Sequence, residues 1–331
     1  MPPTDSHLVS VVIPAYNAQD WIGETLASVR GQTHRALEII VVDDGSTDAT
    51  TDIVDRHVRA DPRVRIIRQP NAGVAAARNN GWRNAAADLI AFVDADDLWA
   101  ATKIERQVEA IERIGPAAGL AYCFFVVIDD TGKVVHFPAQ FPFEGEVLFH
   151  IFHGNFIGNG SAALIRREAL ERVGGFESGL HRAGAQGCED YMIYCRIAEH
   201  YQFAVVPEPL LGYRSLPGNM SSNMARMMRS WLMVVDEMLT RHPDRRRHLL
   251  AGTRFYLHWL LTQAIGDRNI GQYLSALAIA GRRYPSLVPP ILAGDCPMTL
   301  LRVARKWVRR RRGRRPAVIA LPDFRPATVE A

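Results

Sequence analysis

Residues 89–97 read Leu-Ile-Ala-Phe-Val-Asp-Ala-Asp-Asp, a continuous apolar run that stops at three carboxylates within four positions. Such a short run without a polar break is typical of a strand covered on both faces of a sheet. In extended backbone, residues i and i+2 point the same way, so Asp94 and Asp96 can address one ligand together. Carboxylate oxygens suit Mg²⁺ or Mn²⁺. The alternative interpretation is a solvated acidic turn that caps the following helix through Asp96 or Asp97.

The pattern of an apolar run followed by a helix-length polar segment also occurs three times before this stretch. It predicts strands at residues 9–13, 37–42, 64–67 and 89–93, with helices at residues 20–30, 47–59 and 73–86. Successive βαβ units of this kind build a mostly parallel sheet flanked by helices. Ligands of such sheets bind beyond the carboxyl ends of the strands, so the residues that follow each strand are the candidate site residues.

The second half of the chain is less regular. Its pattern predicts helices at 98–114 and 189–199, strands at 120–128, 161–165, 203–206 and 210–213, and then only helices, at 223–241, 249–266, 270–283 and 299–312. The change to helices without strands places a boundary near residue 223. The chain therefore divides into an α/β part and a helical C-terminal region.

Composition favours a protein of a reducing compartment. Four scattered cysteines and no CxxC pair predict neither a disulfide scaffold nor a zinc site. The first residues lack the form of a signal peptide, and no apolar stretch approaches the roughly 18 residues that cross a bilayer. We expect a cytoplasmic protein.

The net charge of +4 is concentrated in one segment. Residues 302–315 hold nine Lys and Arg and no acid, and without them the remainder carries −5. Within residues 300–312, apolar and basic residues alternate at helical spacing, which predicts a basic amphipathic helix able to lie on an anionic membrane surface. A solvated tail is the alternative. Nucleic-acid binding is not expected, because no RNA- or DNA-binding motif accompanies the basic run.

A second acidic cluster, Asp43-Asp44-Gly45-Ser46-Thr47-Asp48, follows the apolar stretch at 37–42. A carboxylate at this place can accept hydrogen bonds from a base N–H or a ribose hydroxyl, which predicts nucleotide recognition. The alternative is a turn and helix cap, a role that suits Ser46 or Thr47.

The third cluster opens the predicted helix at 73–86, where residues 71–79 read NAGVAAARN. Its small residues let the backbone approach a ligand, and Arg78 supplies a cation for a base or a phosphate. The alternative is a tightly packed Ala-rich helix with a surface arginine.

Together these segments resemble glycosyltransferase family 2. The matching stretches are VSVVIPAYN at 9–17, IIVVDDGSTD at 39–48, NAGVAAARNNG at 71–81 and FVDADD at 92–97, in the family's order and approximate spacing. The resemblance covers residues 9 to about 222 and implies the GT-A fold. It further implies an inverting enzyme that uses a nucleotide-diphospho-sugar and Mn²⁺ or Mg²⁺.

The resemblance assigns roles to the donor-side residues. It implies that Pro14, Ala15 and Tyr16 line the nucleotide pocket and that Asp44, with Asp43 nearby, contacts the base. It also implies that Arg78 helps to hold the nucleotide. The DxD element is Asp94-Ala95-Asp96, with Asp96 the direct metal ligand and Asp94 a second ligand or ribose partner.

The acceptor side follows from the same resemblance. Glu189-Asp190 match the family's Glu-Asp pair at the start of a helix, which implies Asp190 as general base and Glu189 as an acceptor-binding residue or alternative base. Two acids that merely complement a helix N-terminus are the alternative. Arg214 matches an arginine that clamps the diphosphate. The histidine that often follows it in the family is absent, so the loop offers no third metal ligand.

The predicted organisation is a catalytic domain at 1–222, made of a nucleotide-sugar-binding half at 1–115 and an acceptor-binding half at 116–222, followed by a helical region at 223–331. We expect transfer from a UDP-sugar to a saccharide or lipid-linked acceptor in cell-surface polysaccharide or glycolipid synthesis, at the inner face of the membrane. A nucleotidyltransferase would carry a Gly-rich basic loop where this chain has residues 14–17, and an inactive scaffold would not need Asp96, Asp190 and Arg214.

Overall fold

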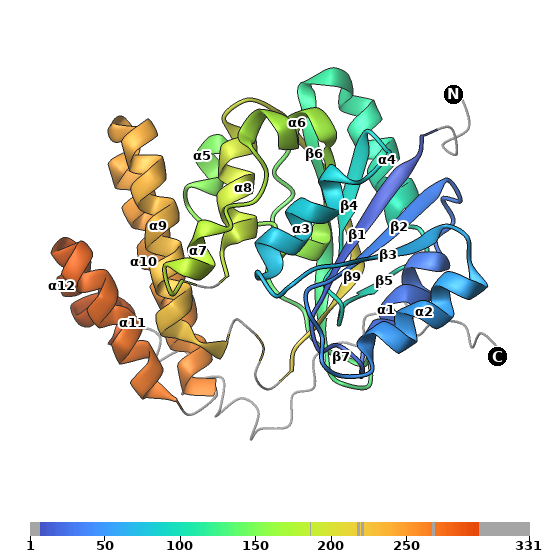
Figure 1. Cartoon of the computed structure of the whole chain (residues 1–331). Helices are drawn as coiled ribbons and strands as arrows, with labels where there is room; N and C mark the ends of the chain where they lie inside the picture. Colours follow the sequence, from blue (N-terminus) through green and yellow to red (C-terminus); the bar gives the residue numbers. More distant parts are fainter. Residues whose placement is uncertain (1–6, 186, 217–218, 220–221, 267–268, 298–331) are drawn as a thin grey trace, which may run out of the picture.

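The computed structural model describes residues 7–297 except 186, 217–218, 220–221 and 267–268. Its centre is a nine-stranded sheet in the order β3-β2-β1-β4-β8-β6-β9-β5, with β7 paired to the outer part of β6 (Figure 1). The strands are β1 Val9–Ala15, β2 Leu37–Asp43, β3 Val64–Arg68, β4 Leu89–Phe92, β5 Leu98–Trp99, β6 Ala118–Ile128, β7 Val134–His136, β8 Ala163–Arg166 and β9 Gln202–Arg214.

The helices cover both faces of the sheet and extend beyond its edge. They are α1 Ile22–Arg30, α2 Thr50–Ala60, α3 Val74–Arg83, α4 Lys103–Ile114, α5 Leu148–Ile151, α6 Arg167–Val173, α7 Gly179–Arg182, α8 Glu189–Ala198, α9 Met224–Arg241, α10 Arg246–Gly266, α11 Ile270–Arg283 and α12 Val288–Pro290. This arrangement confirms the predicted α/β class with a sheet flanked by helices.

The sheet is parallel in its first half and mixed in its second. Strands β3, β2, β1 and β4 pair in parallel, whereas β8 runs antiparallel between β4 and β6. All seven residues of β1 are buried, as expected for a strand covered on both faces. In the register, Ala15 pairs with Asp43, and Val12 pairs with Phe92. The loops after β1, β2 and β4 therefore leave the sheet at one edge.

Close packing of α3 against β1 depends on one glycine. A Cβ added at Gly81 would lie 2.3 Å from a methyl group of Val12, far inside van der Waals contact. Because Gly81 has no side chain, α3 can approach the sheet and bring its first turn to the same edge as the loops.

Three predicted elements differ in detail from the structure. Leu98 and Trp99 form strand β5 against β9, and the helix begins only at Lys103, because both side chains are buried in the sheet layer. The two strands predicted at 203–206 and 210–213 are one continuous β9. The strand predicted at 161–165 begins at Ala163, because Ser161 belongs to a 3₁₀ turn. The hydroxyl of Ser161 forms hydrogen bonds with the acidic loop after β4.

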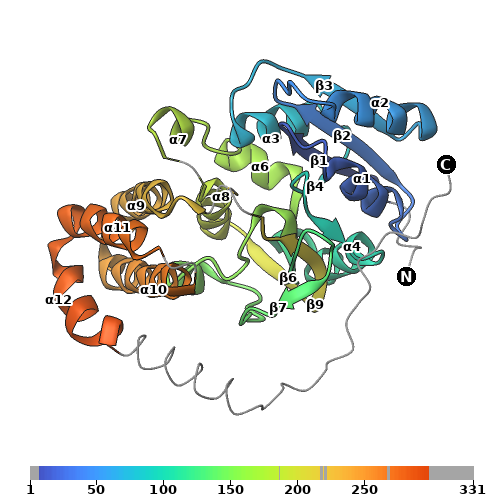
Figure 2. The same ribbon diagram turned by 90° about the horizontal axis from the view of Figure 1, so that it is seen from below.

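Helices α9, α10 and α11 pack together as a layer beside α8 (Figures 1 and 2). Stacked aromatic rings connect this layer to the α/β part. The ring centroid of Trp231 in α9 lies 4.5 Å from that of Tyr191 in α8 and 4.1 Å from that of Tyr256 in α10. Among the described residues, no helix is long and apolar enough to cross a membrane. The amphipathic helix predicted at 299–312 and the basic tail at 302–315 lie outside the described residues.

Candidate active site

The acidic loop after β4 is fixed from three directions. The Ser161 hydroxyl donates to Asp97 Oδ2 at 2.5 Å and accepts the backbone N–H of Asp94 at 2.9 Å. The backbone N–H of Arg214 donates to Asp97 Oδ1 at 2.9 Å. The Thr25 hydroxyl lies 2.9 Å from the carbonyl of Ala95. These bonds hold Asp97 inward and leave Asp94 and Asp96 partly exposed at the edge of the sheet.

Arg78 joins the acidic loop to the Glu-Asp pair. Its Nη2 lies 2.6 Å from Asp94 Oδ1 and its Nη1 lies 2.7 Å from Glu189 Oε1. The Arg78 side chain is only 2% exposed. Both salt-bridged carboxylates thus depend on one buried cation, and α3, the acidic loop and α8 meet at this point.

The space for this cation is provided by Gly160. A Cβ at Gly160 would lie 2.6 Å from Nη2 of Arg78. The ring of Phe176 lies 5.4 Å from the guanidinium carbon, a cation–π contact. Since the Nε of Arg78 has no hydrogen-bond partner among the described residues, the guanidinium is aimed entirely at the two carboxylates.

Asp190 begins α8 beside Glu189. Its Oδ2 accepts a hydrogen bond from the side-chain amide of Asn155 at 3.3 Å, and its Oδ1 accepts the N–H of Tyr191 at 2.7 Å. Burial, followed by the nearby charge of Glu189, raises the pKa of Asp190 to about 7. A carboxyl with such a pKa changes its protonation near neutral pH, as a general base should.

The acidic loop has the chemistry of a cation site. Burial, and then the charge of Asp94, raise the pKa of Asp96 to about 6, and burial raises the pKa of Asp97 well above its usual range. Crowded carboxylates with raised pKa values are stabilised by a cation. The described part of the chain has no cluster of three or more metal-binding side chains. Asp94 and Asp96 therefore fit a hard divalent cation only if other oxygens complete its shell.

Asp44 holds the loop before α3. Its Oδ1 accepts from Gln69 Nε2 at 2.7 Å and from the Ala72 N–H at 2.9 Å, and its Oδ2 accepts from the Gly73 N–H at 2.8 Å. The carboxylate of Asp44 is buried and accepts these three hydrogen bonds. A carboxylate can accept about four hydrogen bonds, so the predicted contact of Asp44 with a base stays a prediction.

The loops after β1 and β2 interlock beside Asp43. The Asp43 Oδ1 accepts the Ser46 N–H at 3.2 Å, while the N–H of Asn17 donates to the Ser46 hydroxyl at 3.0 Å. Ala15 is buried and Tyr16 is 54% exposed. The Tyr16 ring is the one predicted nucleotide-pocket side chain that presents a large open surface.

Arg214 is buried and bonded to protein groups in this structure, and its predicted contact with the diphosphate stays a prediction. Its side chain is 0% exposed, and its Nη2 pairs with Glu24 Oε2 at 2.7 Å. Its Nε donates to the carbonyl of Asp96 at 2.7 Å, and the guanidinium carbon lies 4.4 Å from the Trp21 ring. The predicted diphosphate clamp would have to leave Glu24, so in this conformation Arg214 braces the acidic loop.

Arg78 is also engaged with protein groups in this structure. The sequence predicts that it holds the nucleotide, but both of its Nη groups are bonded to carboxylates and the side chain is buried. It orders Asp94 and Glu189 in this structure, and its predicted contact with the nucleotide stays a prediction.

The structure adds residues that the sequence analysis missed. Asn155 contacts Asp190, Ser161 orders the acidic loop, and Glu24 with Trp21 surrounds Arg214. Asn155 and Ser161 lie in HGNFIGNGS, a Gly- and Asn-rich stretch that indicates a loop beside a site but not which carboxylate it serves. Glu24 and Trp21 carry no signal in the sequence.

Residues 10–174 match the protein-family model described as glycosyl transferase family 2, and through this region the chain belongs to that family. The predicted family is thereby confirmed.

Curated relatives match over part of their length. A Bacillus subtilis protein named as a teichuronic acid biosynthesis glycosyltransferase, TuaG, is 36% identical over 140 residues, which cover 41% of this chain and 56% of that protein. An uncharacterized glycosyltransferase of Nostoc is 31% identical over 194 residues, which cover 56% of this chain and 58% of that protein. The matched regions thus span a little over half of these relatives.

Solved structures share the fold. S. aureus TarS 1-349 superimposes with a TM-score of 0.60 at 16% identity, covering 98% of each chain. The mannosyltransferase PcManGT of Pyrobaculum calidifontis, solved with GDP-Man and Mn²⁺, has a TM-score of 0.58 at 21% identity and covers 92% of this chain and 84% of that chain. The chain therefore has the GT-A fold.

Proposed function

We propose that the chain is an inverting, metal-dependent glycosyltransferase. It moves a hexose or an N-acetylhexosamine from a nucleotide-diphospho-sugar, first of all a UDP-sugar, to an acceptor hydroxyl. The observation that carries the proposal is the ion-pair chain from Asp94 through Arg78 to Glu189, which places a cation-binding loop beside a candidate base. TarS solved with UDP-GlcNAc and PcManGT solved with GDP-Man and Mn²⁺ support a nucleotide-sugar donor.

Asp96 would hold Mn²⁺ or Mg²⁺ directly, with Asp94 beside it, and further oxygens would have to come from outside the protein. A divalent cation bound there neutralises the charge on the departing nucleoside diphosphate. Ser161 and Arg214 keep the loop in place through Asp97. Preorganisation of this kind avoids rearrangement during the reaction.

Asp190 is the general base. An alcohol is too weak an acid to ionise beforehand at neutral pH, so its proton passes to a carboxylate oxygen of Asp190 as the acceptor oxygen attacks the anomeric carbon. The bond from that carbon to the diphosphate breaks, and its electron pair leaves with the diphosphate. A single displacement inverts the anomeric configuration. Asn155 orients the carboxylate, and Glu189 fixes the start of α8 against Arg78.

The nucleotide lies over the loops after β1 and β2. Pro14, Ala15 and Tyr16 form one side of this site, and Asp43 with Asp44 form the other. Ala95 lies between the two acids of the cation site, and its burial keeps the loop compact. Arg78 and Arg214 contribute by positioning carboxylates and backbone in this conformation.

The setting is cell-surface polysaccharide or glycolipid synthesis, with a saccharide or lipid-linked acceptor. The TuaG relative is named for teichuronic acid biosynthesis, which supports this setting. Residues 1–222 form the catalytic domain, with its halves at 1–115 and 116–222, and residues 223–331 form the helical region. The basic tail at 302–315 places the enzyme at the inner face of the membrane, on the cytoplasmic side.

A donor screen tests the proposal. The full chain is incubated with UDP-, GDP- and dTDP-sugars with and without Mn²⁺, and release of nucleoside diphosphate is measured. One donor should be hydrolysed only with metal, and Asp96→Asn and Asp190→Asn should each lower the rate while the exposed control Asp52→Asn leaves it unchanged. Metal-independent hydrolysis that survives Asp96→Asn would contradict the cation site.

A further inference from the structure

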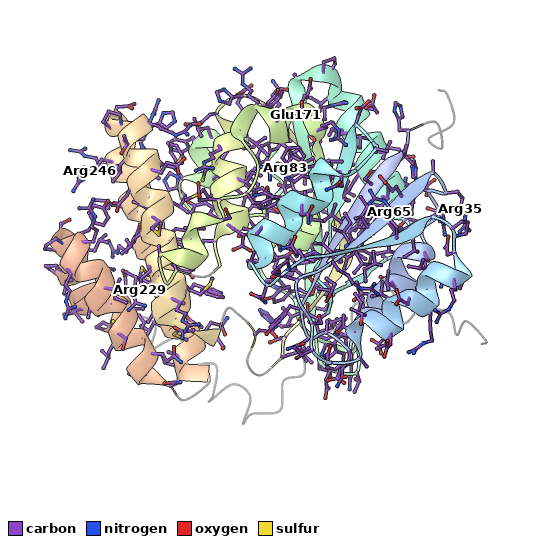
Figure 3. All side chains as sticks on the ribbon, in the orientation of Figure 1. Arg35, Arg65, Arg83, Glu171, Arg229 and Arg246 are labelled. Atoms are coloured by element: carbon purple, nitrogen blue, oxygen red, sulfur yellow. The ribbon has the colours of Figure 1, made fainter. Side chains whose placement is uncertain are left out.

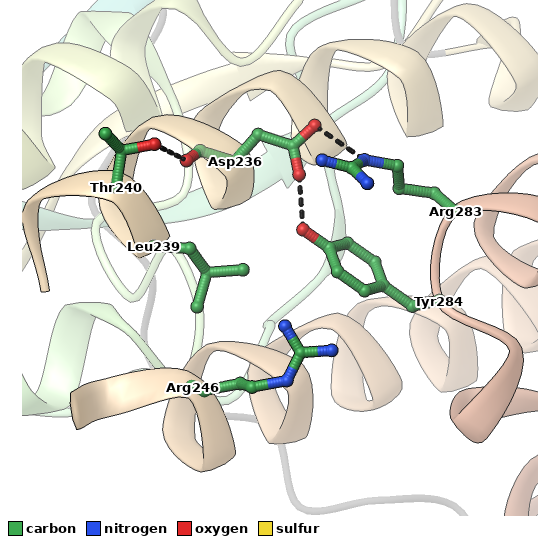
Figure 4. A pocket seen from close by; sticks show the side chains of 6 residues that line it. All are labelled: Asp236, Leu239, Thr240, Arg246, Arg283 and Tyr284. Carbon is green, nitrogen blue, oxygen red and sulfur yellow. Dashed lines mark hydrogen bonds and ion pairs between the residues drawn. The ribbon is translucent and has the colours of Figure 1, made fainter. Parts of the chain in front are cut away.

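A cavity of about 280 Å³ lies in the helical layer, where the end of α9, the start of α10 and the end of α11 meet (Figure 4). Its walls are formed by Asp236, Leu239, Thr240, Arg246, Arg283 and Tyr284. The cavity lies outside the family match at 10–174 and is not part of the proposed donor site.

The one acid in this cavity is already satisfied. Arg283 Nε lies 3.0 Å from Asp236 Oδ2, and the Tyr284 hydroxyl bonds to Asp236 Oδ1. The Thr240 hydroxyl bonds to the backbone carbonyl of Asp236 at 2.9 Å. Figure 4 shows Asp236 turned toward Arg283 and Tyr284. Arg283 and Tyr284 thus occupy one oxygen each of the Asp236 carboxylate, whose ion pair is with Arg283.

Arg246 is the second arginine in the wall of the cavity. Its guanidinium carbon lies 5.5 Å from the centre of the Tyr284 ring, and no carboxylate of the described residues lies within ion-pair distance of it. The guanidinium of Arg283 also lies over this ring, at 5.2 Å. Two cations and one acid give the cavity a net positive charge. A planar guanidinium held against a ring keeps its N–H groups in a fixed fork, the geometry that binds a phosphate in bidentate fashion.

The surrounding charge favours an anionic ligand. The described residues of 223–297 contain nine Lys and Arg but only four Asp and Glu, whereas residues 1–222 contain 19 and 28. Arg229 and Arg246 lie in the helical layer, far from Arg35 and Arg65 at the outer edge of the sheet (Figure 3). A positive surface of this kind concentrates anions near the cavity.

We propose that this cavity binds a phosphate group, with Arg246 as its bidentate anchor and Arg283 as a second donor. The apolar wall at Leu239 and the ring of Tyr284 leave room for a small group attached to the phosphate. The phosphate belongs either to a soluble compound or to the headgroup of a lipid. The site is separate from the donor site and extends the proposed function with a second anion-binding point.

Calorimetric titration of the full chain with inorganic pyrophosphate, in buffer with a chelator, tests the site. Wild type should bind with one site per chain, and Arg246→Gln should weaken binding by about tenfold or more, the loss expected for one charge-assisted bidentate contact. Arg247→Gln, an exposed neighbour outside the cavity, is the matched control and should bind as wild type. Because Arg246 is exposed, its replacement should leave the melting temperature unchanged.

Other outcomes also decide the question. No binding by wild type, or an equal loss in Arg246→Gln and Arg247→Gln, overturns the proposal in favour of no site or of diffuse attraction. Binding that survives Arg246→Gln unchanged places the anion at another site and also overturns it. Vesicles with and without phosphatidic acid distinguish the source: Arg246-dependent sedimentation supports a lipid headgroup, and pyrophosphate binding without it supports a soluble ligand.

Discussion

Asp94 and Glu189, which belong to the two predicted halves of the catalytic domain, are held by the same guanidinium, with Arg78 Nη2 2.6 Å from the first and Nη1 2.7 Å from the second. A substitution at either carboxylate should therefore alter the position or charge balance of the other through Arg78. This contact makes α3 a bridge between the acidic loop and α8.

Replacement of Arg78 by Met should destabilise the fold as well as abolish transfer. Removing the cation leaves the buried carboxylate of Glu189 and the partly exposed carboxylate of Asp94 without their partner, which costs about 3–5 kcal/mol. The free energy of unfolding in urea measures the loss. The double variant Arg78→Met with Glu189→Gln should recover part of it, because only one uncompensated carboxylate remains. An unfolding free energy equal to that of wild type would show that the ion pairs do not stabilise the site.

The backbone at Gly160 should be intolerant of a single methyl group. In Gly160→Ala the added Cβ meets Arg78 Nη2 at 2.6 Å and displaces the guanidinium from Asp94. Overpacking of this kind costs about 1–3 kcal/mol, and we expect donor binding to weaken as well. The control is Gly271→Ala on α11, where the nearest atom lies 4.0 Å away. Equal donor affinity in both variants would disprove the steric role of Gly160.

The rate of transfer should depend on the protonation of Asp190. Its pKa is raised to about 7, and below that value the carboxyl carries a proton and cannot accept another. The groups that face it are Glu189 and Asp94, which raise its pKa, and Arg78, which lowers it, together with the Asn155 amide. The rate at saturating substrate should therefore rise with pH to a plateau above about pH 8. A rate that falls over this range in wild type would contradict Asp190 as base.

Asn155 should act through Asp190. Its amide N–H donates to the ionised carboxylate, so Asn155→Ala should raise the pKa of Asp190 and move the rise in rate to higher pH. The loss should be about tenfold near neutral pH and smaller at high pH. A purely structural role would lower the rate equally at every pH, which distinguishes the two. Gln263→Ala, on the exposed face of α10, is the control.

Much of the fold follows from the sequence because local signals and long-range packing agree. The apolar runs that become β1, β2 and β4 are almost entirely buried, and β1, β2 and β3 are each followed by a helix close to its predicted range. The prediction fails at Leu98 and Trp99, where the apolar pair fits a helix stripe as well as a strand. Pairing with β9, more than a hundred residues away, decides for the strand.

The candidate site was predictable in its residues but not in its contacts. Asp94 and Asp96 could be named as candidates from their place after an apolar strand, and Asp190 from the resemblance to the family. Arg78 and Arg214 were expected to face the ligand, yet each is buried among carboxylates or carbonyls supplied by distant segments. Such partners are set by tertiary packing, which leaves no local pattern. Asn155 was missed for the same reason.

The central claim is that Asp96 holds a divalent cation against the diphosphate of a nucleotide-sugar. Calorimetric titration of the preferred donor, with and without Mn²⁺, into wild type and Asp96→Asn tests it most directly. The account predicts tight binding only for wild type with metal, and weak, metal-independent binding for Asp96→Asn. Equally tight, metal-enhanced binding by both proteins would contradict it.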